Sequence, residues 1–267
     1  MTGGVTFDVS VAHPARIYDY WLGGKDNFAA DRVAAEEVLT VMPAMAQIAR
    51  SVRLFLAAVV HHLAADVGIR QFLDIGTGLP TANNTHEVAQ RAVPEARIVY
   101  VDNDPIVLLH AGALLTGTRP GRCAYVDADV RDPDRVLTEA GSLLDLTEPV
   151  AVMMLGLLHF IPDADDPYSL TRYYLDSLAP GSYLAISHAS SDINTEPQRA
   201  AVERYNARSA TPIVLRSKAE VARFFGGLDL VPPGITPLGQ WAPGTAIPGP
   251  VGLPTYTALA RKPAGPL

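Results

Sequence analysis

Two glycines one residue apart, Gly76 and Gly78, follow a short apolar run, and an acid, Asp74, stands just before them. Residues 82–92 then have the composition of a helix. A buried strand that leads through a tight glycine turn into a helix presents backbone N–H groups to a nucleotide-like ligand. The sequence therefore predicts that this turn, Thr77 included, binds such a ligand through its backbone.

Acids also end the second and third predicted strands. Asp102 comes one strand–helix–strand unit after the glycine turn, where a carboxylate can accept hydrogen bonds from both hydroxyls of a ribose. Asp129 follows the third strand and can accept from an adenine amino group, while the backbone N–H of Val130 donates to the ring. We expect Asn103 and, at the end of the fourth strand, Leu155 to border the same ligand.

The residues around the glycines separate the ligand classes. A dinucleotide site favours a third glycine or an alanine at position 81, where this chain has Thr81 after Pro80. A P-loop needs Gly-Lys-Ser or Gly-Lys-Thr, which the chain lacks. An acid before the glycines, with acids ending strands two and three, is typical of class I methyltransferases, whose cofactor has no phosphate. Asp104 and Asp132 fit helix caps instead.

The loop after the fourth strand carries the best candidate for acid–base chemistry. His159 lies where this fold places the substrate and the reactive end of the cofactor, and an imidazole suits a general base near neutral pH. A structural role, with the ring packed over the cofactor or bonded to a loop, is an equally good interpretation. His188 is a weaker candidate, and His86 fits packing or capping. No Cys or His cluster has the spacing of metal ligands, so we expect no metal.

Alternating strands and helices have to position these residues. Short connections between them predict a doubly wound, mostly parallel, Rossmann-like α/β sheet. We expect seven strands. The last, over residues 255–261, should close the sheet, and it can run parallel or antiparallel to its neighbour. Five of the other six strands are located at 71–75, 97–102, 122–127, 150–155 and 183–188, and the predicted helices are 82–92, 105–115, 133–140, 167–178, 195–208 and 218–225.

The last third of the chain offers walls for an acceptor pocket. Helix 195–208 is one wall, and residues 232–254, dense in Pro and Gly, read as a long irregular loop that forms another. Trp241 within that loop is a candidate lid residue.

An unusual block precedes the first strand. Residues 15–50 are predicted to be helical, but aromatic and acidic side chains crowd the segment and Gly23-Gly24 interrupts it. We interpret the block as a lid over the cofactor, with Tyr18 near the methionine end. A helical cap on the sheet edge, with Tyr18 and Tyr20 half-buried, is the alternative.

The composition limits the classes of protein to which this chain can belong. The 267 residues are 48% hydrophobic and 18% charged, which fits one large globular domain or one domain with a modest appendage. The net charge of −7 disfavours nucleic acid as a partner. The single Cys123 fits a reducing compartment and a buried strand thiol. No secretory signal is visible, and no apolar run approaches the roughly 20 residues of a membrane span. We expect a soluble, cytoplasmic protein without a membrane partner.

Specific motifs carry a resemblance to one family. Residues 14–28 read PARIYDYWLGGKDNF, residues 211–217 read TPIVLRS, and 72–87 and 100–105 hold the glycine turn and the second acid. Over nearly its whole length the chain resembles an actinobacterial S-adenosylmethionine-dependent methyltransferase family long known as a domain of unknown function. The resemblance implies a class I methyltransferase fold over residues 67–267, an N-terminal helical extension over 1–66, and S-adenosyl-L-methionine as cofactor.

Three functions follow from these observations. The leading one is methyl transfer to an unidentified acceptor, which we expect to be a small molecule, with a homodimer left open. The second is a non-catalytic regulatory protein that binds S-adenosylmethionine or S-adenosylhomocysteine. A nicotinamide-dependent oxidoreductase is the third, and Pro80 and Thr81 disfavour it.

Overall fold

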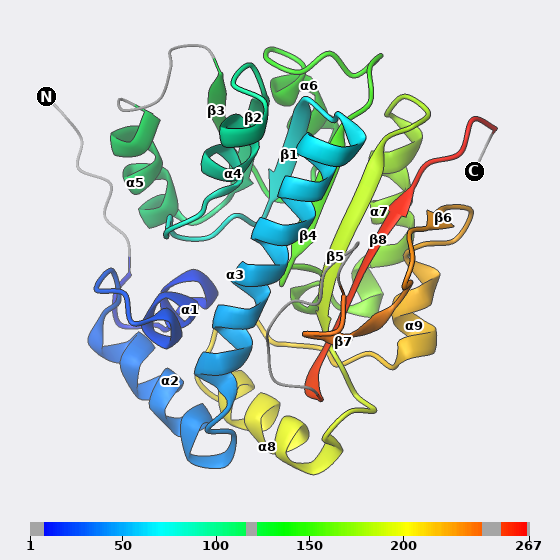
Figure 1. Cartoon of the computed structure of the whole chain (residues 1–267). Coiled ribbons are helices and arrows are strands. Elements are labelled where there is room, and N and C mark those ends of the chain that lie inside the picture. The colour runs from blue at the N-terminus through cyan, green and yellow to red at the C-terminus, as the bar shows by residue number, and fades with distance from the viewer. Residues whose placement is uncertain (1–7, 116–121, 242–251, 266–267) are drawn as a thin grey trace, which may run out of the picture.

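The computed structural model describes residues 8–115, 122–241 and 252–265, and a single mixed sheet organises them (Figure 1). Five parallel strands lie in the order β3-β2-β1-β4-β5, and antiparallel β8 extends the sheet beside β5. The predicted doubly wound, mostly parallel α/β fold is therefore confirmed, with an antiparallel closing strand. The parallel strands are β1 Gln71–Ile75, β2 Arg97–Asp102, β3 Cys123–Asp127, β4 Ala151–Leu155 and β5 Tyr183–Ala189.

Within the described residues the sheet contains eight strands rather than the seven that the sequence predicts. β8 spans Leu253–Arg261, and both β6 (Asp229–Leu230) and β7 (Thr236–Leu238) pair with it. Strands of two and three residues are too short to show an alternating pattern. β7 also lies in the segment read as an irregular loop, of which residues 242–251 are outside the described part of the chain.

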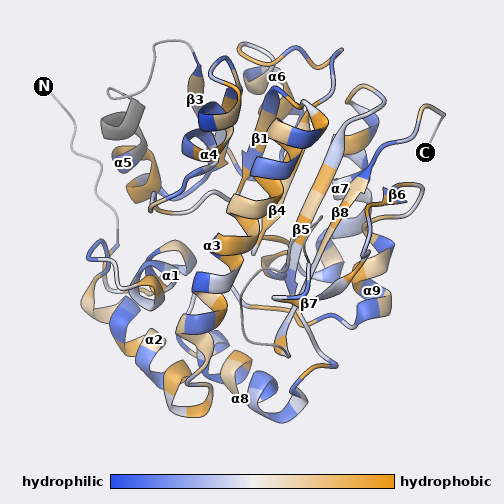
Figure 2. Cartoon of the chain, viewed as in Figure 1, coloured by the Kyte–Doolittle hydropathy of each residue, from blue (hydrophilic) through white to orange (hydrophobic). Residues whose placement is uncertain are grey.

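Apolar side chains cover both faces of the sheet. Successive residues of a strand point to opposite faces, so Phe72 of β1 joins one apolar cluster and Leu73 the other. The first cluster includes residues of α3 (Met45–His61) and α4 (Thr85–Ala92), and the second includes residues of α6 (Pro133–Ala140) and α7 (Pro167–Asp176). Figure 2 shows β4 as a mainly apolar strand at the centre. Burial on both faces explains why these strands read as near-continuous apolar runs.

Local signals set where the helices begin. The Asp132 carboxylate accepts a hydrogen bond from the backbone N–H of Arg135 at 3.3 Å, and Pro133 occupies the first turn of α6. Asp104 likewise accepts from the N–H of Ile106 at 2.9 Å at the start of α5 (Pro105–Leu115). Both predicted caps are confirmed. Helix α4 begins three residues later than predicted, because residues 82–84 form a turn.

The N-terminal segment forms separate helices, and the predicted break at Gly23-Gly24 is confirmed. α1 (Pro14–Leu22) ends at Gly23, whose φ of +82° is a left-handed cap. A Cβ at Gly24 would come within 1.9 Å of an Asp19 carboxylate oxygen, so glycine lets the backbone approach that side chain. α1 packs on α2 (Ala29–Val41), α2 packs on α8 (Thr195–Asn206), and α3 lies across the sheet in Figure 1.

Helix α3 continues as a π-helical turn, η1 (His62–Val67). Together they run from Met45 to Val67 and, by length and composition alone, could cross a membrane. The prediction that no segment approaches such a length is therefore wrong for this helix. The core helix of a soluble protein passes the same test, and 56% of the apolar window is buried against the rest of the chain.

Candidate active site

A cavity of about 290 Å³ lies at the carboxyl ends of β1, β2, β4 and β5, with side chains of α1, α3 and α8 among its walls. The residues that line it come from segments spread along the chain from His13 to Thr255. Every residue predicted for ligand binding or catalysis lines it: Tyr18, Asp74, Gly76, Thr77, Gly78, Asp102, Asn103, Asp129, Val130, Leu155 and His159. The structure thus brings them together in one place, while their contacts with a ligand stay predictions.

The glycine turn contributes open space rather than free N–H groups. The N–H groups of Gly76 and Thr77 donate to the Val101 carbonyl at 2.8 and 3.3 Å, and that of Gly78 donates to Asp102 at 2.8 Å. The prediction that these groups face a ligand is wrong, because the next strand already binds them. Gly78 has φ +65°, and a Cβ there would meet no atom within 4 Å. A ligand can therefore approach the backbone closely at this residue.

Asp102 is buried and fixed by two backbone donors. One of its oxygens accepts from Gly78, and the other accepts from the Asp104 N–H at 2.9 Å. Burial raises the pKa of this carboxyl, while the two hydrogen bonds act to lower it. Each carboxylate oxygen has a second lone pair. Asp102 can thus hold the turn and still accept from the two hydroxyls of a ribose.

An acid and a cation lie together beside the turn. The Thr85 hydroxyl donates to Asp74 at 2.6 Å, and burial raises the pKa of Asp74 to about 6. The Arg53 guanidinium, from α3, donates to the carbonyls of Ala82 and Asn83 at 3.3 and 3.1 Å. Its buried Nε has no partner among the described residues. Our sequence analysis missed Arg53, although a cation on the apolar helix that precedes β1 was a visible signal.

Asp129 is less free than its predicted role requires. Arg131 donates to both of its carboxylate oxygens, from Nε at 2.9 Å and from a terminal nitrogen at 2.8 Å. The Asn103 amide adds a third contact at 3.2 Å, and these partners lower the pKa of Asp129. An adenine amino group would have to share this carboxylate with Arg131.

His159 lies in a short 3₁₀ turn after β4, η2 (Leu158–Phe160). Its Nδ1 is buried without a hydrogen-bond partner among the described residues. Burial, followed by the neighbouring His188 and Arg216, lowers the pKa of His159 well below its usual value. The ring is therefore neutral at pH 7, ready to accept a proton but weakly basic.

His188 has both ring nitrogens engaged. Its Nδ1 lies 2.8 Å from the Ala189 carbonyl, and its Nε2 lies 2.9 Å from an Arg216 nitrogen. Since arginine only donates, the Nε2 of His188 is the acceptor in this contact. Burial lowers the pKa of His188 to about 4. His188 lacks a free site for a proton, which removes the weaker of the two base candidates.

The chain matches the S-adenosyl methyltransferase family over residues 2–263. It belongs to that family. A DUF574 family protein of Streptomyces avermitilis is 44% identical, with a TM-score of 0.91 over 96% of this chain and 99% of that one. A Thermobifida fusca protein, provisionally assigned as a methyltransferase, is 38% identical, with a TM-score of 0.88 over 96% and 97%.

A more distant structure shares the fold alone. An O-methyltransferase family protein of Burkholderia thailandensis is 15% identical, with a TM-score of 0.54 over 84% of this chain and 62% of that one. None of the curated proteins matches the chain significantly. The predicted family and class I methyltransferase fold are confirmed, and S-adenosyl-L-methionine is the cofactor of this S-adenosyl methyltransferase.

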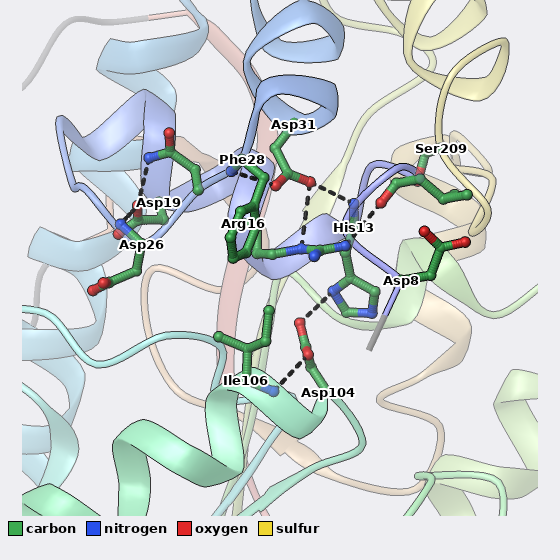
Figure 3. Close-up of polar contacts among 12 residues, drawn as sticks. Asp8, His13, Arg16, Asp19, Asp26, Phe28, Asp31, Asp104, Ile106 and Ser209 are labelled. Atoms are coloured by element: carbon green, nitrogen blue, oxygen red, sulfur yellow. Dashed lines mark hydrogen bonds and ion pairs between the residues drawn. The ribbon is translucent and has the colours of Figure 1, made fainter. Parts of the chain in front are cut away.

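In this methyltransferase the N-terminal block is fixed to the sheet by a polar cluster (Figure 3). The fully buried Asp31 accepts from the backbone N–H of His13 at 2.9 Å and pairs with Arg16 at 3.4 Å. His13 Nδ1 lies 2.8 Å from Asp104, next to Asp102. The Tyr18 hydroxyl donates to the Ala49 carbonyl on α3 at 2.9 Å, so its ring forms part of the cavity wall.

Three further predictions concern residues outside the cavity. Trp241 is fully buried, with its ring 5.1 Å from that of Phe55, so it belongs to the core and the lid role is wrong. His86 binds the Tyr100 hydroxyl at 2.7 Å, which confirms its packing role. Cys123 is half-buried on β3, and burial raises the pKa of its thiol to about 11.

Proposed function

We propose that this family member transfers the methyl group of S-adenosyl-L-methionine to a small molecule bound in the same cavity. The observation that carries the proposal is the continuity of that cavity. It extends from the glycine turn at Gly76 to the loop that holds His159 and to the inner face of α8. Donor and acceptor could therefore meet within one space, and proximity of this kind supplies much of the acceleration in a displacement reaction.

The side chains near the turn fit the methionine end of the cofactor. That end carries an ammonium and a carboxylate, and Asp74 and Arg53 offer the opposite charges within one wall. The unpartnered Arg53 Nε supplies an N–H group for a carboxylate oxygen. Tyr18 on α1 would border this end. When bound, the cofactor supplies an electrophilic methyl group on a sulfonium sulfur.

The ends of β2 and β3 fit the adenosine end. Asp102 would bind the ribose hydroxyls, with Asn103 beside it, and Asp129 and the Val130 N–H would border the adenine ring. Leu155, at the end of β4, would lie under the sulfonium region. These residues bind and orient the cofactor, and His159 is the group placed to accept the acceptor's proton.

Calorimetry with the purified full-length protein tests the cofactor assignment. We expect saturable binding of S-adenosylhomocysteine and none of oxidised nicotinamide dinucleotides. Asp102→Asn should weaken S-adenosylhomocysteine binding at least tenfold, because it replaces an anionic acceptor of two hydrogen bonds with an amide. Glu203→Gln, on the exposed face of α8, serves as a control that leaves the affinity unchanged. Undiminished binding in Asp102→Asn would reject the ribose role.

A labelled-methyl screen tests transfer itself. Radiolabelled S-adenosyl-L-methionine is incubated with the protein and with low-molecular-weight and macromolecular fractions of a cell extract. We expect label in the small-molecule fraction, and none when His159→Phe replaces the wild type if the ring acts as a base. Label only in protein or nucleic acid would contradict the small-molecule proposal.

A further inference from the structure

One wall of the cavity is a continuous series of rings. The His159 ring lies 4.3 Å from that of Phe160, which lies 6.2 Å from that of Tyr205, which in turn lies 6.5 Å from that of Trp21. All four residues line the cavity, and we call them the aromatic wall. Three separate elements supply them: η2, α8 and α1. A planar apolar molecule would find complementary faces here.

Formal charges in the cavity come from elements other than those that supply the aromatic wall. Among the described lining residues the charged ones are Arg53, Asp74, Asp102, Asp129 and Arg131. Arg53 binds the turn after Gly78, and the acids stand at the ends of β1, β2 and β3. The proposed cofactor contacts account for Arg53 and the three acids, and Arg131 pairs with Asp129. The aromatic wall thus offers nothing to neutralise a carboxylate, a phosphate or an ammonium, whose burial without a partner is strongly unfavourable.

Four polar atoms in or beside the aromatic wall have no hydrogen-bond partner among the described residues. They are Ser187 Oγ, Gln198 Oε1, His159 Nδ1 and the Tyr205 hydroxyl oxygen, each buried at the atom and each from a residue that lines the cavity. Ser187 is 1% exposed and Gln198 is 3% exposed. Buried polar atoms are normally paired in folded proteins, so four unpaired ones at one end of the cavity indicate a ligand that completes them.

Local geometry defines what the ligand must offer. The Gln198 Nε2 donates to the Pro254 carbonyl at 3.4 Å, which leaves Oε1 as an acceptor. Gln198 and Tyr205 share one face of α8, and Ser187 stands at the end of β5 opposite Leu155. A serine hydroxyl both donates and accepts. A ligand hydroxyl can donate to Gln198 and also exchange a hydrogen bond with Ser187.

We propose that the aromatic wall, Ser187 and Gln198 form the acceptor subsite, and that the acceptor is a neutral aromatic molecule whose hydroxyl group receives the methyl. This inference rests on the proposed methyltransferase function. In the reaction the acceptor's O–H bond breaks and its proton passes to His159. The acceptor oxygen bonds to the methyl carbon, and the electron pair of the broken C–S bond stays on sulfur, which leaves a thioether.

The weak basicity of His159 supports an aromatic hydroxyl over an aliphatic one. Its pKa is held low by burial and by the nearby His188 and Arg216. A phenolic hydroxyl has a pKa of about 10, whereas an aliphatic alcohol is several orders of magnitude less acidic. A weak base can assist proton loss from the first but contributes little with the second.

Matched naphthalene probes test the subsite. With the full chain saturated in S-adenosylhomocysteine, we would measure the binding of 2-naphthol, naphthalene and 2-naphthoate by calorimetry. We expect 2-naphthol to bind at least about tenfold more tightly than the other two, because buried polar groups reject a ligand that leaves them unpaired. Equal or tighter binding of 2-naphthoate would overturn the proposal.

Variants assign the selectivity to the named residues. Gln198→Leu should reduce the 2-naphthol to naphthalene affinity ratio about tenfold, and Ser187→Ala should also reduce it. Glu203→Leu places the same side chain on the solvent face of α8 and should leave the ratio unchanged. An unaltered ratio in Ser187→Ala, the smaller truncation, would reject the subsite even if Gln198→Leu fails to fold.

The proposed function and the acceptor subsite can be rejected separately. Loss of S-adenosylhomocysteine binding in the wild type would reject the proposed function itself. Normal S-adenosylhomocysteine binding without hydroxyl selectivity would reject only the acceptor subsite.

Discussion

At the scale of single residues, the site depends on a few polar groups whose surroundings change their chemistry. Burial raises the pKa of Asp74 to about 6 and lowers that of His159. In each case the neutral form is favoured, because transfer from water disfavours the charged form. A carboxyl that titrates near neutrality makes cofactor affinity depend on pH, and a neutral imidazole is able to take up a proton.

We expect the affinity for S-adenosylhomocysteine to rise about tenfold between pH 5 and pH 7, as Asp74 ionises and pairs with the ligand ammonium. Calorimetry across this range measures the effect. Asp74→Asn should bind more weakly at pH 7 and show a smaller slope. A flat wild-type profile would argue that Asp74 only organises the loop.

The raised pKa of Asp74 has the opposite consequence for the stability of the unliganded protein, which falls as the pH rises. The folded-state pKa of Asp74 lies above the usual 3.8, so the folded chain holds this proton more tightly than the unfolded chain. The contribution is fully present below pH 3.8 and is lost as the pH rises through about 6. Urea unfolding should therefore show a wild-type free energy of unfolding that falls over this interval relative to Asp74→Asn.

Gly78→Val should abolish measurable S-adenosylhomocysteine binding, because the side chain would occupy open space in the cavity. It should also cost about 1–2 kcal/mol of stability, since valine disfavours a positive φ. Gly68→Val is the matched control, with φ +87° and open space around its Cβ, at the amino end of β1. The control should lose similar stability and keep normal affinity, and a similar loss of affinity in both would point to strain alone.

At the scale of elements, the loop that carries His159 is held by one buried cation. Arg216 is 1% exposed and donates to the carbonyls of Leu158 and Ile161, to His188 and to the Asp163 carboxylate, all within 2.7–2.9 Å. Its guanidinium also lies 5.6 Å from the centre of the Phe224 ring. A planar fork with several donors suits this task, and lysine could not make all four contacts.

Arg216→Met should lower the free energy of unfolding by about 3–5 kcal/mol, because it leaves buried acceptors unpaired. Arg216→Lys should recover only part of that loss. The matched control is Arg223→Met: Arg223 lies 3.7 Å over the Tyr168 ring but is solvent-exposed, so its loss should cost below about 1 kcal/mol. Equal losses at the two arginines, measured in urea, would contradict the role of Arg216 in holding the loop of His159.

At the scale of the whole molecule, the N-terminal block is both a wall and a covering. Its helices supply Tyr18 and Trp21 to the cavity, and the His13–Asp104 pair connects it to the strand end that holds Asp102. The half-buried Tyr18 and Tyr20 are compatible with the cap as well as with the lid. We propose the lid, because the block reaches the residues proposed to bind the cofactor rather than a bare sheet edge.

Deletion of residues 1–32 should weaken S-adenosylhomocysteine binding at least tenfold, since it removes Tyr18, His13 and Asp31 together. The chain has two tryptophans, so the deletion leaves the fully buried Trp241 as the single reporter of an intact core. Its emission should stay at the wild-type wavelength. Unchanged affinity in a folded deletion variant would reject the lid.

The sequence by itself determined the sheet, the ligand class and the place of the site. Apolar runs ending in Asp74, Asp102 and Asp129 are local patterns. Parallel strands bring their carboxyl ends to one edge of the sheet however the side chains pack. It could not predict β6 and β7, because pairs of two or three residues depend on β8 alone.

Only the tertiary structure decided which hydrogen-bonding groups are free to contact a ligand. In the folded chain the N–H groups of the glycine turn donate to β2, and both ring nitrogens of His188 have partners. Trp241 is buried in the core. Arg53 and Gln198 line the cavity from segments outside the motifs that the sequence shows, and Arg216, within the TPIVLRS motif, contacts the loop of His159 across the fold. Hydrogen-bond partners and burial are properties of side chains that meet across the fold, so residue types and spacing alone do not specify them.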